Sequence, residues 1–142
     1  VHFLRTNREW KIFFLGGLID KAQKTEFSSV IKIRFRCSSH AYAVKGDLAR
    51  HLISQSWSNV PYDSMLRNEA NLAAFAARPG FAFQSSSCSD NTATMGIDRI
   101  RRLLGGIQRI QKMNNFYQIY KTQVILAHAV LAGLVGLLIL AL

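Results

Sequence analysis

Residues 124–142 are the feature that most constrains how this chain can fold. They contain no Asp, Glu, Lys or Arg, and their one ionisable side chain is that of His128. At 1.5 Å per residue, a helix of nineteen residues spans about 28 Å, close to the roughly 30 Å hydrocarbon layer of a bilayer. A buried helix of a soluble protein normally carries a polar stripe, and this segment has none. The sequence therefore predicts a transmembrane helix, which we place at residues 122–142.

The residues before this segment are typical of a membrane interface. Phe116, Tyr117 and Tyr120 precede it, followed by Lys121. Aromatic side chains gather at headgroup level, and Lys and Arg are enriched on the inner side of a membrane. All 18 Lys and Arg of the chain lie before residue 124. We therefore expect the N-terminal side to face the cytosol, matrix or stroma.

Residues 97–121 predict a basic amphipathic helix that leads into the transmembrane helix. Apolar residues recur in steps of three and four, which places them on one stripe of a helix. Gly105 and Gly106 each weaken the helix by about 1 kcal/mol relative to Ala, so we expect a bend there. Such a helix can lie on an anionic membrane, bind a partner protein or bind nucleic acid, and its continuity with the apolar segment favours the first two. The side chains predicted to contact the membrane surface or a partner are Arg99, Arg101, Arg102, Ile107, Arg109, Ile110 and Lys112.

Two features inside the apolar segment are candidate sites. Small residues four apart would let another helix approach closely, and they are Ala129 with Gly133 and Ala132 with Gly136. An intramembrane His can ligate haem or relay protons, which makes His128 a candidate cofactor ligand. It has no second ligand nearby in the sequence, so a structural role is the preferred interpretation.

The N-terminal region, residues 1–46, is basic and contains one strand signal. Residues 30–37 alternate apolar and basic side chains, which is typical of a half-buried strand. No partner strand is evident, so the rest of this region is predicted to be irregular. The basic side chains of the strand could contact phosphates, but aromatic residues do not share their face, which favours a solvated face over nucleic-acid binding. These side chains are Lys32, Arg34 and Arg36.

Residues 47–96 are rich in Ala and Ser and have two readings. From Met65 onward, Arg67 and Arg78 stand among Ala and Ser with few acids, which resembles organelle import signals as a class, although Glu69 departs from that pattern. The alternative is a plain Ala-rich helix over residues 64–78. In either case, residues 84–94 predict a polar linker.

The remaining chemistry-bearing residues give no catalytic signature. Cys37 and Cys88 lie fifty-one residues apart, without the paired spacing of a metal site or a disulfide framework. We therefore predict no metal and no cofactor, and an enzyme is the less favoured interpretation.

These patterns together predict a mainly α membrane protein with four regions, 1–46, 47–96, 97–121 and 122–142. Its expected role is that of a small single-pass accessory or anchoring subunit of a multi-protein complex in the mitochondrial inner membrane, with a plastid membrane as the alternative. Its expected partners are lipids and other subunits, without nucleic acid or a small-molecule substrate. The alternative function is that of an N-terminal membrane anchor for a longer enzyme or carrier whose catalytic part lies beyond residue 142.

Overall fold

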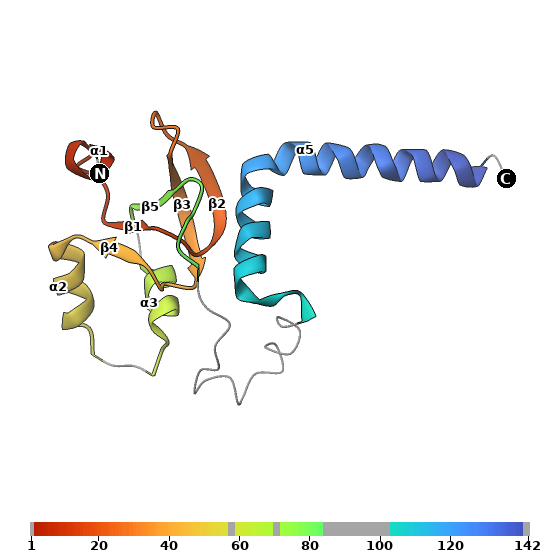
Figure 1. The fold of residues 1–142 in the computed structure, drawn as a ribbon. Coiled ribbons are helices and arrows are strands. Elements are labelled where there is room, and N and C mark those ends of the chain that lie inside the picture. The colour runs from red at the N-terminus through yellow and green to blue at the C-terminus, as the bar shows by residue number, and fades with distance from the viewer. Residues whose placement is uncertain (1, 57–58, 70–71, 84–102, 141–142) are drawn as a thin grey trace.

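The computed structural model describes residues 2–56, 59–69, 72–83 and 103–140. These residues form a mixed five-stranded sheet with short helices, followed by a long bent helix (Figure 1). The strands are β1 (Ile12–Phe14), β2 (Leu18–Lys24), β3 (Val30–Cys37), β4 (Tyr42–Val44) and β5 (Ala74–Ala77). The helices are α1 (His2–Thr6), α2 (Gly46–Ser54), α3 (Tyr62–Asn68) and α5 (Gly106–Leu140).

The predicted strand at residues 30–37 is confirmed as β3. Its apolar side chains Ile31, Ile33 and Phe35 are buried, and the basic side chains between them are exposed, as the alternation requires. The strands run in the order β2-β3-β5-β1-β4, in which β3 pairs antiparallel with both β2 and β5, and β5 pairs parallel with β1.

The prediction of a mainly α protein with an irregular N-terminal part is wrong, because the described residues of that part build a sheet. The Ala-rich stretch shows the reason most clearly. The helix over residues 64–78, one of the two interpretations of this stretch, ends at Asn68 in α3, and residues 74–77 form β5 instead. Alanine favours helices by less than 1 kcal/mol over most residues. Burying Ala74, Phe75 and Ala76 between two neighbouring strands outweighs that preference.

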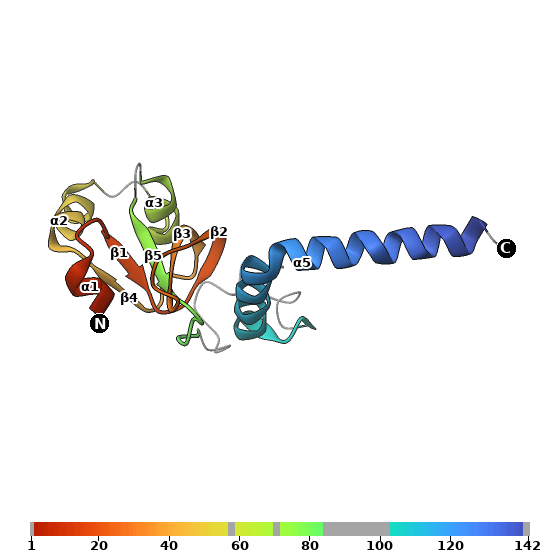
Figure 2. The same cartoon turned by 90° about the horizontal axis from the view of Figure 1, so that it is seen from above.

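Helices lie on both faces of the sheet (Figure 2), and the buried side chains form a cluster on each face. On one face, side chains from α2 and α3 pack against the strands, and the rings of Phe14 and Phe35 stack with their centroids 4.5 Å apart. On the other face, Phe3 of α1 packs against Phe13 and Phe75. The sheet is thus covered by helices from different parts of the chain, which fixes the positions of its short strands.

The helix α5 consists of two arms that meet at Tyr120, whose backbone is non-helical (φ −112°, ψ 25°). We call residues 106–119 the first arm and residues 121–140 the second arm. The first arm lies beside β2, and the second arm runs away from the sheet (Figures 1 and 2). Gly105 and Gly106 have positive φ values of 87° and 81°, which glycine adopts readily, so the chain turns there as expected. The second bend, at Tyr120, was not predicted.

Replacing Leu66 tests whether α3 closes the core. Leu66 is fully buried among the side chains on the face of the sheet that α2 and α3 cover. Leu66→Ala should therefore lower the free energy of unfolding by about 2–5 kcal/mol. The matched control is Ile53→Ala on α2, because Ile53 is 83% exposed. Its effect should stay within about 0.5 kcal/mol. Denaturant titration of the full chain in detergent micelles, followed by near-UV circular dichroism, measures both. Equal stability of the two variants would contradict this packing.

Candidate functional site on the bent helix

Among the residues that the structure describes, none packs against the second arm so as to cover it. Ten of its large apolar side chains are exposed, all between Ile125 and Leu140. Among the described residues, α5 is the helix whose length and composition would allow it to cross a membrane. The mean hydropathy of an 18-residue window in it is 2.3, and no part of that window is buried. The segment predicted to span a membrane is therefore helical up to Leu140 and is open to its surroundings over this described part.

The first arm attaches to the sheet through polar side chains. The amide group of Asn114 forms two hydrogen bonds with the backbone of Ile19 in β2. Its Oδ1 accepts from the Ile19 N–H at 3.0 Å, and its Nδ2 donates to the Ile19 carbonyl oxygen at 3.0 Å. One turn later, Gln118 Nε2 donates to the carbonyl oxygen of Asp20 at 3.0 Å. Gln111, one turn earlier, is fully buried.

The backbone of β2 explains why amide side chains fit here. The register between β2 and β3 shifts on both sides of Ile19, so that Ile19 pairs with Phe35 and Lys21 with Arg34, while Asp20 is skipped. Since β2 is an edge strand, its outward N–H and C=O groups need partners from elsewhere. An Asn side chain carries both a donor and an acceptor. Asn114 thus takes the place of a neighbouring strand at Ile19.

The opposite side of the first arm is apolar and basic, and we call it the outer face. Met113 and Phe116 are 59% and 58% exposed, and the rings of Phe116 and Tyr120 lie 4.9 Å apart. The apolar stripe predicted for this helix therefore faces away from the sheet over this stretch. Asp and Glu are absent from residues 103–140, so the face carries only positive charge. Its members are Arg109, Lys112, Met113, Phe116, Tyr117 and Tyr120.

The predicted contact residues of the first arm fall into three groups. Arg109 and Lys112 are exposed on the outer face, and the Lys112 ammonium lies 5.3 Å from the ring centroid of Phe83. Ile107 and Ile110 are half-buried. The arginines that precede the helix lie outside the described residues, and they are Arg99, Arg101 and Arg102. Sequence reasoning missed the amide side chains that hold the arm.

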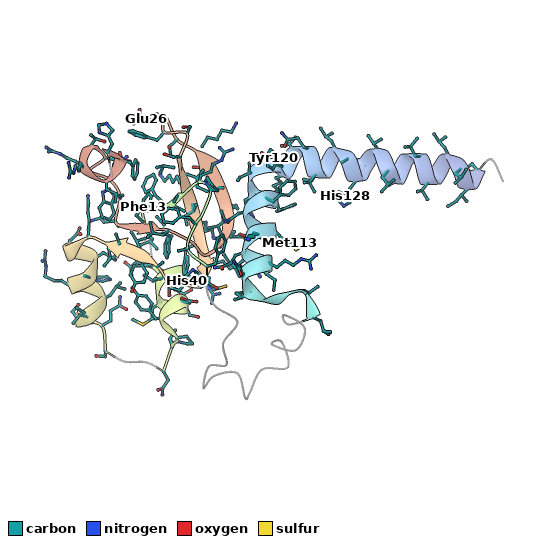
Figure 3. The ribbon with its side chains drawn as sticks, in the orientation of Figure 1. Phe13, Glu26, His40, Met113, Tyr120 and His128 are labelled. Carbon is teal, nitrogen blue, oxygen red and sulfur yellow. The ribbon has the colours of Figure 1, made fainter. Side chains whose placement is uncertain are left out.

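The candidate residues of the second arm are exposed or half-buried, with no neighbour against the glycines. A Cβ atom added at Gly133 or Gly136 would meet no atom within 4 Å. Ala129 and Ala132 are exposed beside them on the helix. His128 Nδ1 lies 2.7 Å from the carbonyl oxygen of Val124, one turn earlier, so the ring nitrogen bonds within its own helix (Figure 3). Among the described residues, no group of three His, Cys, Asp or Glu lies close enough to hold a metal ion.

A concave surface lies on the sheet domain, by which we mean the described residues from α1 to β5, between β4, α2 and α3. It is an open groove of about 430 Å³ lined by Tyr42, Val44, Ala49, Leu52, Ile53, Gln55, Tyr62 and Met65. Burial, and then a hydrogen bond with Tyr42, raises the pKa of the Tyr62 phenol well above its usual value of 10. Tyr62 therefore stays protonated at neutral pH. The groove offers an apolar surface without an acid or base that titrates near neutrality.

The comparisons with known proteins supply no relative. The chain matches no protein family, no curated protein and no solved structure. The features that bear on its function are the bent helix and the surfaces of the sheet domain.

Removing the Asn114 amide tests the attachment of the first arm. In Asn114→Ala, the Ile19 N–H loses its acceptor. The free energy of opening at Ile19 should therefore fall by about 0.5–1.5 kcal/mol, and its amide hydrogen should exchange correspondingly faster. Amide exchange measured by NMR on the full chain in micelles gives the rate. The control variant is Gln108→Ala, an exposed position on the same arm. The Lys11 amide, which donates to the Ala73 carbonyl oxygen, should be unchanged in both variants. An unchanged Ile19 rate in Asn114→Ala would show that the arm is not held in this way.

Proposed function

We propose that the protein is a small single-pass membrane protein that holds its sheet domain at the bilayer surface and serves as an accessory or anchoring subunit of a membrane complex. The observation that carries the proposal is the second arm. Its ten exposed large apolar side chains belong to the part of α5 that no other described residue covers, and this part carries no Asp, Glu, Lys or Arg from residue 122 onward.

The free energy at stake supports a membrane as the surroundings of the second arm. Covering a Val, Leu or Ile side chain completely contributes about 1.5–3 kcal/mol, so ten of them represent up to about 15–30 kcal/mol. A typical domain has a net stability of only about 5–15 kcal/mol. Moving this arm from water into an apolar environment would therefore release more free energy than the net stability of a typical domain. A soluble helical assembly would need a polar face toward water, and the arm has none. A lipid core covers all sides at once.

Two surfaces support a role as a subunit. The small residues of the second arm line one side of the helix, where nothing in the chain opposes them. The apolar groove between β4, α2 and α3 provides a contact surface without acid–base chemistry.

The organellar address, in the mitochondrial inner membrane or a plastid membrane, and the transit peptide stay predictions from composition. Within the stretch on which they depend, α3 and β5 are also elements of the domain.

Placing a charge in the second arm tests the membrane anchor. The wild-type protein should stay in the membrane pellet after alkaline carbonate washing. Leu134→Arg places a guanidinium near the middle of the proposed span and should weaken insertion by about 3 kcal/mol. Its control, Thr122→Arg, lies just after the bend, where a long basic side chain can reach the headgroups. Release of the wild-type protein into the supernatant would rule out the anchor.

Adding bulk at Gly133 tests membership of a complex. Nothing in the chain lies within 4 Å of a Cβ at this position, so Gly133→Leu should leave the isolated protein intact and obstruct only a neighbouring helix. Ala127→Leu adds similar bulk on the opposite side of the helix and is the matched control. On a native gel in mild detergent, the wild type and Ala127→Leu should co-migrate with a larger assembly that Gly133→Leu has left. A wild-type protein that runs alone at monomer size would contradict the subunit role.

A further inference from the structure

We infer that the outer face of the first arm lies flat on an anionic lipid surface, which fixes how the sheet domain is oriented on the membrane. The inference rests on the proposed anchor and adds a second contact to it. The partner of the outer face, whose apolar side chains are exposed in the structure, is then the lipid headgroup region.

The bend at Tyr120 sets the direction of the second arm relative to the sheet domain. The sheet domain lies on one side of the first arm, and the second arm leaves toward the other side (Figures 1 and 2). Asn114 and Gln118 hold the first side against β2, while Met113 lies on the far side and Tyr120 at the bend (Figure 3). When the second arm enters a bilayer, the first arm is carried onto its surface. The outer face is the side that then meets the lipid.

The side chains of the outer face are of the kinds that bind an anionic membrane surface. It combines four exposed apolar or aromatic side chains with Arg109 and Lys112, and it contains no acid. Aromatic rings favour the headgroup level, and basic amphipathic helices lie in the plane of an anionic interface. The side that faces the sheet carries uncharged amides instead, such as Asn114 and Gln118. The helix therefore has separate faces for the domain and for the lipid.

Continuity with the anchor favours lipid over a protein as the occupant. Tyr120 belongs to the outer face and is also the residue at which the two arms meet. Only Lys121, Thr122 and Gln123 separate it from the apolar run that begins at Val124, so the outer face cannot stand far from the headgroups. The positive charge of this face, with Lys121 next to it, complements an anionic leaflet.

This contact would decide which part of the domain faces away from the membrane. The first arm lies along β2, at one edge of the sheet, and β4 is the strand at the opposite edge. With neighbouring strands about 4.8 Å apart, four spacings place β4 about 19 Å farther from the arm than β2. The apolar groove beside β4 would then face away from the membrane, where a partner can reach it.

Site-specific photo-crosslinking of the full chain tests the inference. Photoreactive p-benzoylphenylalanine replaces Phe116 on the outer face, Leu126 on the second arm, or Ile53 on α2, all of which are exposed. Each variant is reconstituted into vesicles of phosphatidylcholine with phosphatidylserine, irradiated and examined by intact-mass spectrometry. We expect lipid adducts at positions 116 and 126 and none at position 53.

Charge removal supplies the second measurement. In Arg109→Gln with Lys112→Gln, or in vesicles of phosphatidylcholine alone, the adduct at position 116 should fall while that at position 126 stays. The expected loss in the occupancy of the surface is about fivefold for each basic residue removed. An adduct at position 116 that does not depend on phosphatidylserine would overturn the anionic partner.

The remaining outcomes separate this inference from the anchor. Lipid adducts at position 126 without any at position 116 would overturn the inference and leave the anchor standing. A crosslink from position 116 to a second copy of the chain would overturn it as well, because protein would then cover the outer face. The absence of lipid adducts at position 126 would overturn the anchor and the inference together.

Discussion

The pairing of the Asn114 amide with the backbone of Ile19 is the interaction on which the arrangement of this protein depends. It closes the edge of the sheet with a side chain that has both a donor and an acceptor. It also fixes the rotation of the first arm about its own axis. Because one face of a helix is held against the strand, the opposite face is exposed. The exposure of the apolar outer face therefore follows from the hydrogen bonds that hold the amide side chains against β2.

The parts of the fold that the sequence predicted are those with a long local pattern. Eight alternating residues are enough to identify β3, and the uncharged run identifies the helical second arm. The strands β1, β4 and β5 have only three or four residues each, too few for a period to show. The pairing of β1 with β5 joins residues some sixty positions apart, such as Phe13 and Phe75, and that of β1 with β4 joins residues about thirty apart, such as Phe13 and Ala43. Local propensity contains no information about such a partner, and for the Ala-rich β5 it favours the wrong element.

The candidate site was predicted in part, because only one of two helical stripes was taken as a contact surface. The apolar stripe was expected to bind a membrane or a partner, and the structure leaves much of it exposed. The residues Gln111, Asn114, Asn115 and Gln118 follow the same spacing of three and four, but polar stripes usually face solvent. Here the stripe meets an edge strand, whose backbone needs hydrogen bonds more than apolar cover. A stripe of uncharged amide side chains opposite an apolar stripe was the sequence pattern that could have predicted this contact with an edge strand.

The two bends of the C-terminal region have different physical origins, and the difference bears on function. At Gly105 and Gly106, the positive φ values are intrinsic to glycine, so that turn follows from the local sequence. Tyr120 is no helix breaker, and its non-helical backbone comes directly after the residues that bond to β2. The first arm is held in place up to Gln118, and the apolar part of the helix beyond the bend is not buried by any described residue. The direction of the second arm is thus set where attachment to the domain ends, which is where an anchor would have to leave the surface and enter the bilayer.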